Sequence, residues 1–260
     1  MQKLRSVVKP KFQYHDSGAV ANLFDTLIKN TNDAERVASA FNKQVLIPSR
    51  CRFLISDVTR LQPLLAGVPE GGFDCVVMDP PWENKSAKRS GHYPTLPSRH
   101  LLSVPIARLL KQEGGLLAMW VTNRERLRRF VDQELLPKWG LEQVATWFWL
   151  KVTNSGQLVS PLEVAHRRPY EVLLLARPRS SNASGGAVCQ EQCRAVPDMV
   201  FFAVPGDHSR KPHLGRLLRR HLPAHPACLE MFARELGADW TSWGNETLHF
   251  QTLDRFSAPY

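Results

Sequence analysis

Long apolar runs are missing from this sequence. Nowhere in its 260 residues does one reach the roughly 18 residues that a membrane-spanning helix needs. The first ten residues contain Lys3, Arg5 and Lys9, and no apolar stretch follows these charges. We therefore expect no membrane-spanning helix in the chain and no secretory signal at this end of it.

Cysteine is scarce. The sequence holds five, an odd number, mostly in apolar segments: Cys51, Cys75, Cys189, Cys193 and Cys228. This usage is typical of a reducing, intracellular compartment. Cys189 and Cys193 are close enough in sequence to suggest zinc, but no second Cys/His pair stands near them at finger spacing. We favour unliganded loop thiols and predict no metal site.

Basic residues, by contrast, are in excess. Lysine and arginine number 34 against 24 aspartates and glutamates, which gives a formal charge of +10. Such an excess favours a polyanionic partner such as nucleic acid, because neutralising phosphates releases counterions. Hydrophobic residues make up 43% of the chain, which is enough to bury the core of one α/β domain.

The first forty-odd residues contain apolar positions at helical spacing. Apolar residues between Val20 and Ile28 recur on one side of a helical pattern. Asn32 stands three residues before Glu35, as in the capping box that begins a helix. We predict an N-terminal helical extension over residues 1–44, followed by the main domain over residues 45–260.

From residue 52 onward, short apolar runs alternate with amphipathic stretches. The clearest helices are predicted at Arg124–Leu136, ended by Pro137, and at Leu214–Leu222, ended by Pro223. This alternation predicts an α/β fold with a mainly parallel sheet covered on both faces. Residues 178–197 are rich in Ser and Gly and are predicted to form a flexible loop. The predicted strands are Arg52–Ser56, Phe73–Met78, Leu116–Val121, Val144–Val152, Glu171–Ala176, Val200–Val204 and Cys228–Phe232.

The tetrapeptide Asp79-Pro80-Pro81-Trp82 directly follows one of these strands. Ligands of open α/β sheets bind beyond the carboxyl ends of strands, so the position suits an active site. A structural turn closed by an aromatic residue is the alternative. The apolar strand before the tetrapeptide and the acid at its start favour a functional role for all four residues.

These groups suit a reaction at a poorly nucleophilic amine, such as methylation of the N6 amine of adenine. The N6 lone pair of adenine is delocalised into the ring, so the amine is a poor nucleophile. The Asp79 carboxylate and the Pro80 carbonyl can each accept an N–H bond, which pulls the amine toward tetrahedral geometry, and the proline ring holds that carbonyl in place. Trp82 offers a face on which a purine can stack.

Around these residues the sequence resembles the adenine-N6 methyltransferase family that includes the messenger-RNA writers, and is most similar to its methyltransferase-like protein 4 branch. The likeness runs from about Arg52 to Phe250. It is carried by Met78–Trp82, Trp120–Arg124, Lys151–Gly156, Leu229–Arg234 and Trp240–Glu246.

The resemblance implies a Rossmann-like sheet in circularly permuted order, with S-adenosylmethionine as cofactor. In that order the cofactor turn follows the late strand Cys228–Phe232, which explains why no Gly-x-Gly loop follows the first strand. Glu235 and Leu236 replace a His-Asn pair that contacts the ribose in some members, so that contact is not expected. The implied cofactor residues are Asp57, Val58, Asp79, Lys211, Glu230, Phe232, Arg234, Asn245 and Glu246.

Cations interleaved with aromatic residues suit a single-stranded nucleic acid, because they provide charge for phosphates and rings for bases. The alternative is ordinary solvated loops, with Trp149 in the core. The arginine run from Arg124 to Arg129 is interpreted as a solvated helix face. The predicted substrate residues are Lys85, Lys88, Arg89, Tyr93, Trp149, Lys151, His166, Arg167 and Arg168, with Arg99 beside them.

Together these features predict methyl transfer to the N6 amine of adenosine in RNA. The branch resemblance further implies a nuclear enzyme acting on 2′-O-methyladenosine of a small nuclear RNA. DNA adenine methylation stays open, since both nucleic acids present the same N6 edge. A non-catalytic RNA-binding subunit is the other alternative, and the intact tetrapeptide argues against it. A monomer is expected, with a partner subunit left open.

Overall fold

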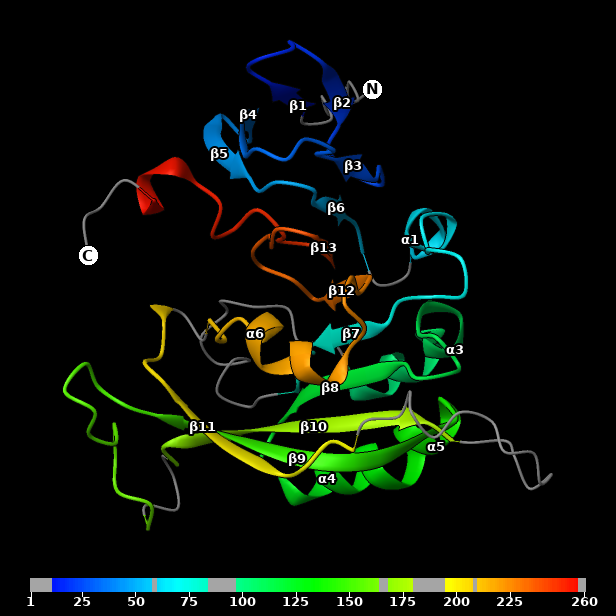
Figure 1. The fold of residues 1–260 in the computed structure, drawn as a ribbon, viewed down its shortest axis with the longest axis vertical. Coiled ribbons are helices and arrows are strands. Elements are labelled where there is room, and N and C mark those ends of the chain that lie inside the picture. Colours follow the sequence, from blue (N-terminus) through cyan, green and yellow to red (C-terminus); the bar gives the residue numbers. More distant parts are fainter. Residues whose placement is uncertain are drawn as a thin grey trace, which may run out of the picture. The chain divides into compact units, whose positions relative to one another are not determined.

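A computed structural model describes residues 11–57, 60–83, 97–163, 168–179, 195–207 and 210–256. The chain divides into two compact units, the first made of Met1–Val68 and Leu229–Tyr260 and the second of Pro69–Cys228. Figure 1 colours both units by sequence position. In the described residues, every helix is too short or too polar to cross a membrane.

The N-terminal part of the first unit is a small antiparallel sheet of four strands in the order β2-β1-β4-β5. It is drawn in blue in Figure 1. Its strands are β1 (Lys11–Tyr14), β2 (Val20–Asn22), β4 (Arg36–Ala40) and β5 (Lys43–Ile47).

The predicted N-terminal helical extension is therefore wrong. Burial alternates along β1, so Phe12 and Tyr14 are buried while Lys11 and Gln13 are exposed. Asp25 also lies at a positive φ of 56°, in the middle of the apolar run, where a right-handed helix could not continue. The segment therefore forms strands, because tertiary packing favours alternate burial over the helical spacing of the apolar residues between Val20 and Ile28.

A second group of strands completes the first unit, in the order β12-β13-β6-β3. β13 runs parallel to β6, and β3 runs antiparallel to it. Phe12, Tyr14, Phe53, Ile55 and Leu248 share one hydrophobic core, so the N-terminal strands are an integral part of this unit. The bounds are β3 (Ile28–Lys29), β6 (Arg52–Ile55), β12 (Cys228–Met231) and β13 (Trp240–Gly244).

The second unit contains the strand order β11-β9-β10-β8-β7. β7 and β9 run parallel to β8 and β11 respectively, whereas β10 runs antiparallel to both β8 and β9. The predicted strands are all present in the two units, and the α/β class is confirmed. The bounds are β7 (Cys75–Met78), β8 (Leu116–Val121), β9 (Leu141–Lys151), β10 (Tyr170–Pro178) and β11 (Met199–Ala203).

The helices are short. The one predicted to end before Pro137 instead continues to Lys138, because Pro137 stands in the first turn after a π-helical segment, where its missing N–H costs little. The helix predicted at Leu214–Leu222 is helical through His221 and stops before Pro223. The helices are α1 (Gln62–Ala66), α3 (Ile106–Leu109), α4 (Glu125–Phe130), α5 (Leu136–Lys138) and α6 (Gly215–Leu218).

Replacing Phe12 tests whether the N-terminal strands belong to the core. Phe12 is 1% exposed, so Phe12→Ala should lower the free energy of unfolding by about 3–5 kcal/mol through lost burial and a residual cavity. Val20→Ala is the control, because Val20 is 55% exposed and its loss should change stability by less than about 0.5 kcal/mol. Denaturant titration would measure both, and equal stability of the two variants would contradict the shared core.

Candidate functional site

The tetrapeptide forms a tight turn directly after the fully buried strand β7. Pro80 is buried, while Asp79 and Trp82 are half-buried. The Trp82 backbone N–H donates to the Pro80 carbonyl at 2.7 Å, and the Trp82 indole N–H donates to the Trp120 carbonyl on β8 at 3.0 Å. A carbonyl oxygen has two lone pairs, so the first bond orients the Pro80 oxygen without exhausting its capacity to accept.

Asp79 belongs to a network of alternating charges. The Lys211 ammonium lies 2.9 Å from Asp79 Oδ2 and 3.2 Å from Glu171 Oε2. Lys151, at the end of β9, lies 2.6 Å from Glu171 Oε1. The second unit thus brings together Asp79, Lys151 and Lys211, which the sequence singled out, and adds Glu171 on β10.

Sequence reasoning missed Glu171 as a site residue. The available signal was a carboxylate at the start of an apolar strand, Glu171–Ala176 in the prediction. Carboxylates are almost never buried without a partner, so an acid in such a strand indicates a nearby cation. The partner could not be identified, because Lys211 lies forty residues further along the chain.

The charges in this network reinforce one another. Burial acts to lower the pKa of Lys211, but the carboxylates of Asp79 and Glu171 outweigh it and raise the pKa above its ordinary value. Burial likewise acts to raise the pKa of Glu171, and the two lysines overcome this and lower it. Lys211 is therefore a cation and Glu171 an anion at neutral pH.

Trp149 belongs to the core. Its side chain is 1% exposed, its indole N–H donates to the Ala203 carbonyl at 3.0 Å, and its ring centroid lies 5.9 Å from that of Trp120. A ring buried in this way has no face to offer a base, so the prediction of Trp149 as a substrate contact is wrong. Trp149 instead contacts a member of the charge network, because the Lys151 ammonium lies over its ring, 5.0 Å from the centroid.

Most of the other predicted substrate residues cannot be placed. Arg168 is exposed and donates to the Tyr170 hydroxyl at 2.5 Å, while Arg99 pairs with Glu134 at 2.9 Å. The roles of these arginines stay predictions. Lys85, Lys88, Arg89, Tyr93, His166 and Arg167 lie outside the described residues.

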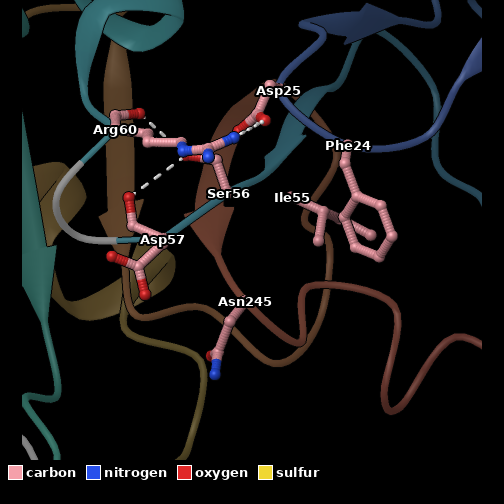
Figure 2. Close-up of a pocket in the computed structure, with 7 residues that line it drawn as sticks. All are labelled: Phe24, Asp25, Ile55, Ser56, Asp57, Arg60 and Asn245. Carbon is pink, nitrogen blue, oxygen red and sulfur yellow. Dashed lines mark hydrogen bonds and ion pairs between the residues drawn. The ribbon is translucent and has the colours of Figure 1, made fainter. Parts of the chain in front are cut away.

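The first unit holds a pocket of about 530 Å³, shown in Figure 2. Asp57 and Asn245, both predicted cofactor residues, line it although they are far apart in the sequence. In the view of Figure 2, the Asn245 amide lies below Asp57 and Phe24. Phe24, Asp25 and Arg60 also line the pocket, and sequence reasoning missed all three.

These side chains suit an adenosine-containing cofactor. An amide that both donates and accepts hydrogen bonds matches the edge of adenine, a carboxylate matches an amine or a ribose hydroxyl, and Ile55 adds an apolar surface. Val58 lies outside the described residues.

The turn after β12 carries further predicted cofactor residues. Phe232 has a positive φ of 62°, and the next N–H, that of Ala233, donates to the Trp243 carbonyl at 2.9 Å. Gly244 packs so closely here that a Cβ on it would lie 2.8 Å from the Ala233 carbonyl oxygen, and this packing fixes the backbone immediately before Asn245.

Arg234 and Glu246 form an ion pair in the same region, with 3.3 Å between Arg234 Nε and Glu246 Oε2. The Arg234 guanidinium also lies over the Phe250 ring, 4.8 Å from its centroid. Glu230, on β12, is half-buried. Whether these residues contact a cofactor stays a prediction.

The three described cysteines, Cys51, Cys75 and Cys228, are buried free thiols. Within the described ranges, no cluster of three or more His, Cys, Asp or Glu side chains could hold a metal ion. Cys189 and Cys193 fall in the undescribed segment 180–194, so their interpretation as loop thiols stays a prediction.

Comparison with known proteins identifies the family. Residues 73–246 match the MT-A70 family model. The chain belongs to the MT-A70 family. This confirms the resemblance carried by the tetrapeptide and its neighbouring motifs.

Relatives within MT-A70 differ in their named substrates. Human N(6)-adenine-specific methyltransferase METTL4 is 40% identical over 91% of this chain and 50% of its own length. N6-methyladenosine RNA methyltransferase MTA1 of Pyricularia oryzae is 40% identical over 72% of this chain and 50% of its own. A DNA N6-methyl methyltransferase of Caenorhabditis elegans is 33% identical over 81% and 55%. The chain spans about half the length of these relatives.

Changing Glu171 tests the charge network in this MT-A70 chain. Because the folded pKa of Glu171 lies below its ordinary value of 4.5, its stabilising effect is present above that pH and is lost as the pH falls through the lowered pKa. At pH 7, Glu171→Gln should cost about 1.5–3 kcal/mol, the size expected for hydrogen bonds to charged groups. Thermal unfolding from pH 7 to pH 3 should show this difference shrinking.

A matched control is available on α4. Glu125 pairs with Arg129 at 3.8 Å but is 85% exposed, so Glu125→Gln should leave stability nearly unchanged at every pH. If Glu171→Gln proved as stable as the wild type at pH 7, the network would not stabilise the fold as we describe.

Proposed function

We propose that this chain is the catalytic part of an S-adenosylmethionine-dependent methyltransferase that acts on the N6 amine of adenine in a nucleic acid. The observation that carries the proposal is the Asp79–Trp82 turn, whose carboxylate is held 2.9 Å from Lys211, in a chain of the MT-A70 family. The relatives are named as adenine N6-methyltransferases, which agrees with this chemistry.

The turn acts on the methyl acceptor. The Asp79 carboxylate and the Pro80 carbonyl accept the two N–H bonds of the amine, so the nitrogen lone pair is withdrawn from the ring and becomes nucleophilic. Lys211, whose ammonium lies 2.9 Å from Asp79 Oδ2, keeps the carboxylate oriented. Trp82, fixed by its bond to Trp120, supplies a face against which the target base packs.

Bound S-adenosylmethionine supplies an electrophilic methyl group on its sulfonium sulfur. We assign Asp57 and Asn245 to its adenosine part, because both line the 530 Å³ pocket. Lys211 is assigned to its carboxylate as well as to Asp79, since an ammonium has three donors. Val58, Asp79, Glu230, Phe232, Arg234 and Glu246 complete the proposed cofactor set.

The order of these parts along the chain supports a circularly permuted fold. The catalytic turn follows β7, whereas the proposed cofactor turn at Phe232 follows β12, more than a hundred residues later. A methyltransferase of the commoner order has its cofactor turn first. Permutation thus explains why the sequence has no Gly-x-Gly loop at its first strand.

We propose RNA as the substrate, and specifically 2′-O-methyladenosine of a small nuclear RNA, methylated in the nucleus. The net charge of +10 supports a polyanionic partner, and the likeness to fungal MTA1, which is named an RNA methyltransferase, supports RNA. DNA is the second candidate, favoured by the likeness to the C. elegans DNA N6-methyl methyltransferase. A non-catalytic subunit is less well supported, because the tetrapeptide and its lysine partner are both intact.

Asp79→Ala tests the assignment of the turn. Methyl transfer to a single-stranded adenosine oligonucleotide should fall by about 10²–10³-fold, because one acceptor of the transition state is lost. Asp132→Ala, at an exposed position of the π-helical segment Val131–Leu135, is the control and should retain wild-type turnover. Activity of the Asp79 variant within threefold of wild type would overturn the assignment.

A further inference from the structure

Phe24 stands out in the first unit as a large aromatic ring that the fold leaves exposed. It lines the 530 Å³ pocket, and 40% of its surface is accessible. Its backbone is attached to the end of β6 by a bridge with Ile55, another residue of the pocket. A large apolar side chain held at the mouth of a pocket, rather than buried, indicates a ligand-binding role.

The backbone around Phe24 is constrained at some cost. Asp25 has a positive φ of 56°, which non-glycine residues rarely adopt. Two contacts hold it there: its N–H donates to the Ile55 carbonyl at 2.9 Å, and its carboxylate pairs with Arg60 at 2.8 Å. Figure 2 shows this Asp25–Arg60 pair at the pocket. Strained residues of this kind gather at ligand clamps, where the surrounding structure holds them.

A second strained residue, the aromatic Phe41, lies beside the Phe24 ring. Phe41 has a positive φ of 52°, is followed by Asn42 at 59°, and forms the tight turn between β4 and β5. Turns of this kind favour Asn and Gly, so a phenylalanine here is unusual. The Phe41 ring is 48% exposed and lies 6.0 Å, centroid to centroid, from that of Phe24. The Phe41 ring thus packs beside the Phe24 ring.

We infer that Phe24 is the aromatic surface on which the adenine of the cofactor stacks, and that Phe41 and the Asp25–Arg60 pair are positioning residues for it. The inference rests on the proposed function. Adenine is the part of the cofactor with a π-face, and the Asn245 amide in the same pocket suits its hydrogen-bonding edge. Phe24, Asp25 and Arg60 all precede residue 73, where the match to the family model begins.

Calorimetric titration without nucleic acid tests this inference, with S-adenosylhomocysteine and 5′-methylthioadenosine as probes. Both carry the adenine, but the second lacks the aminocarboxylate. Phe24→Ala and Phe24→Leu should weaken both probes by about tenfold, the size expected for one base–aromatic stack, whereas Phe24→Trp should bind like the wild type. Leucine keeps apolar volume without the ring, so it separates stacking from simple filling.

Phe202→Ala is the matched control, because Phe202 is 65% exposed on β11 in the other unit and should leave binding unchanged. Phe24→Leu binding within twofold of wild type, in a variant with unaltered thermal unfolding, would overturn the inference. If the wild type itself bound neither probe, the proposed function would fail instead.

Discussion

The placement of a lysine between two carboxylates is the constraint on which the rest of the catalytic region depends. Lys211 comes from a segment after β11, Asp79 from the turn after β7 and Glu171 from β10, so one ammonium joins three distant parts of the second unit. Removing these charges from water is costly, and it is tolerated only because each has an opposite charge within hydrogen-bonding distance. A change at any member removes one of the opposite charges that stabilise its neighbours.

This arrangement also suits the proposed chemistry. A carboxylate that must accept an N–H bond at a defined place cannot rotate freely, and Lys211 fixes it from one side. Two further bonds fix the turn: the Trp82 backbone N–H donates to the Pro80 carbonyl, and the Trp82 indole N–H donates to the Trp120 carbonyl. Catalysis by oriented acceptors works only when they are in place before the reaction, because reorientation would consume the stabilisation that they provide.

The sequence predicted the parts that depend on local pattern. Short motifs predicted the tetrapeptide after a buried strand and the α/β alternation after Arg52. The family resemblance predicted Asp57 and Asn245 as cofactor residues, and both line one pocket. The parts that it missed depend on contacts between distant residues. Glu171 belongs to the site because it contacts Lys211, and Phe24 lies at the pocket because its backbone forms a bridge with Ile55. The cations beside Trp149 favour a substrate contact, whereas the alternation of burial along β9, which decides whether a ring faces the core, places Trp149 in the core.

The identity of the methylated nucleoside is the most direct test of the account. Purified protein would be incubated with isotopically labelled S-adenosylmethionine and matched single-stranded RNA and DNA of identical sequence, and the digested nucleosides would be analysed by mass spectrometry. We predict labelled N6-methyladenosine, formed faster from RNA than from DNA and fastest from RNA that contains 2′-O-methyladenosine. Faster turnover on DNA would change the assigned substrate from RNA to DNA and leave the assigned reaction unchanged. Binding of the cofactor without labelled N6-methyladenine in either polymer would contradict the central claim that Asp79 and its turn activate an adenine amine.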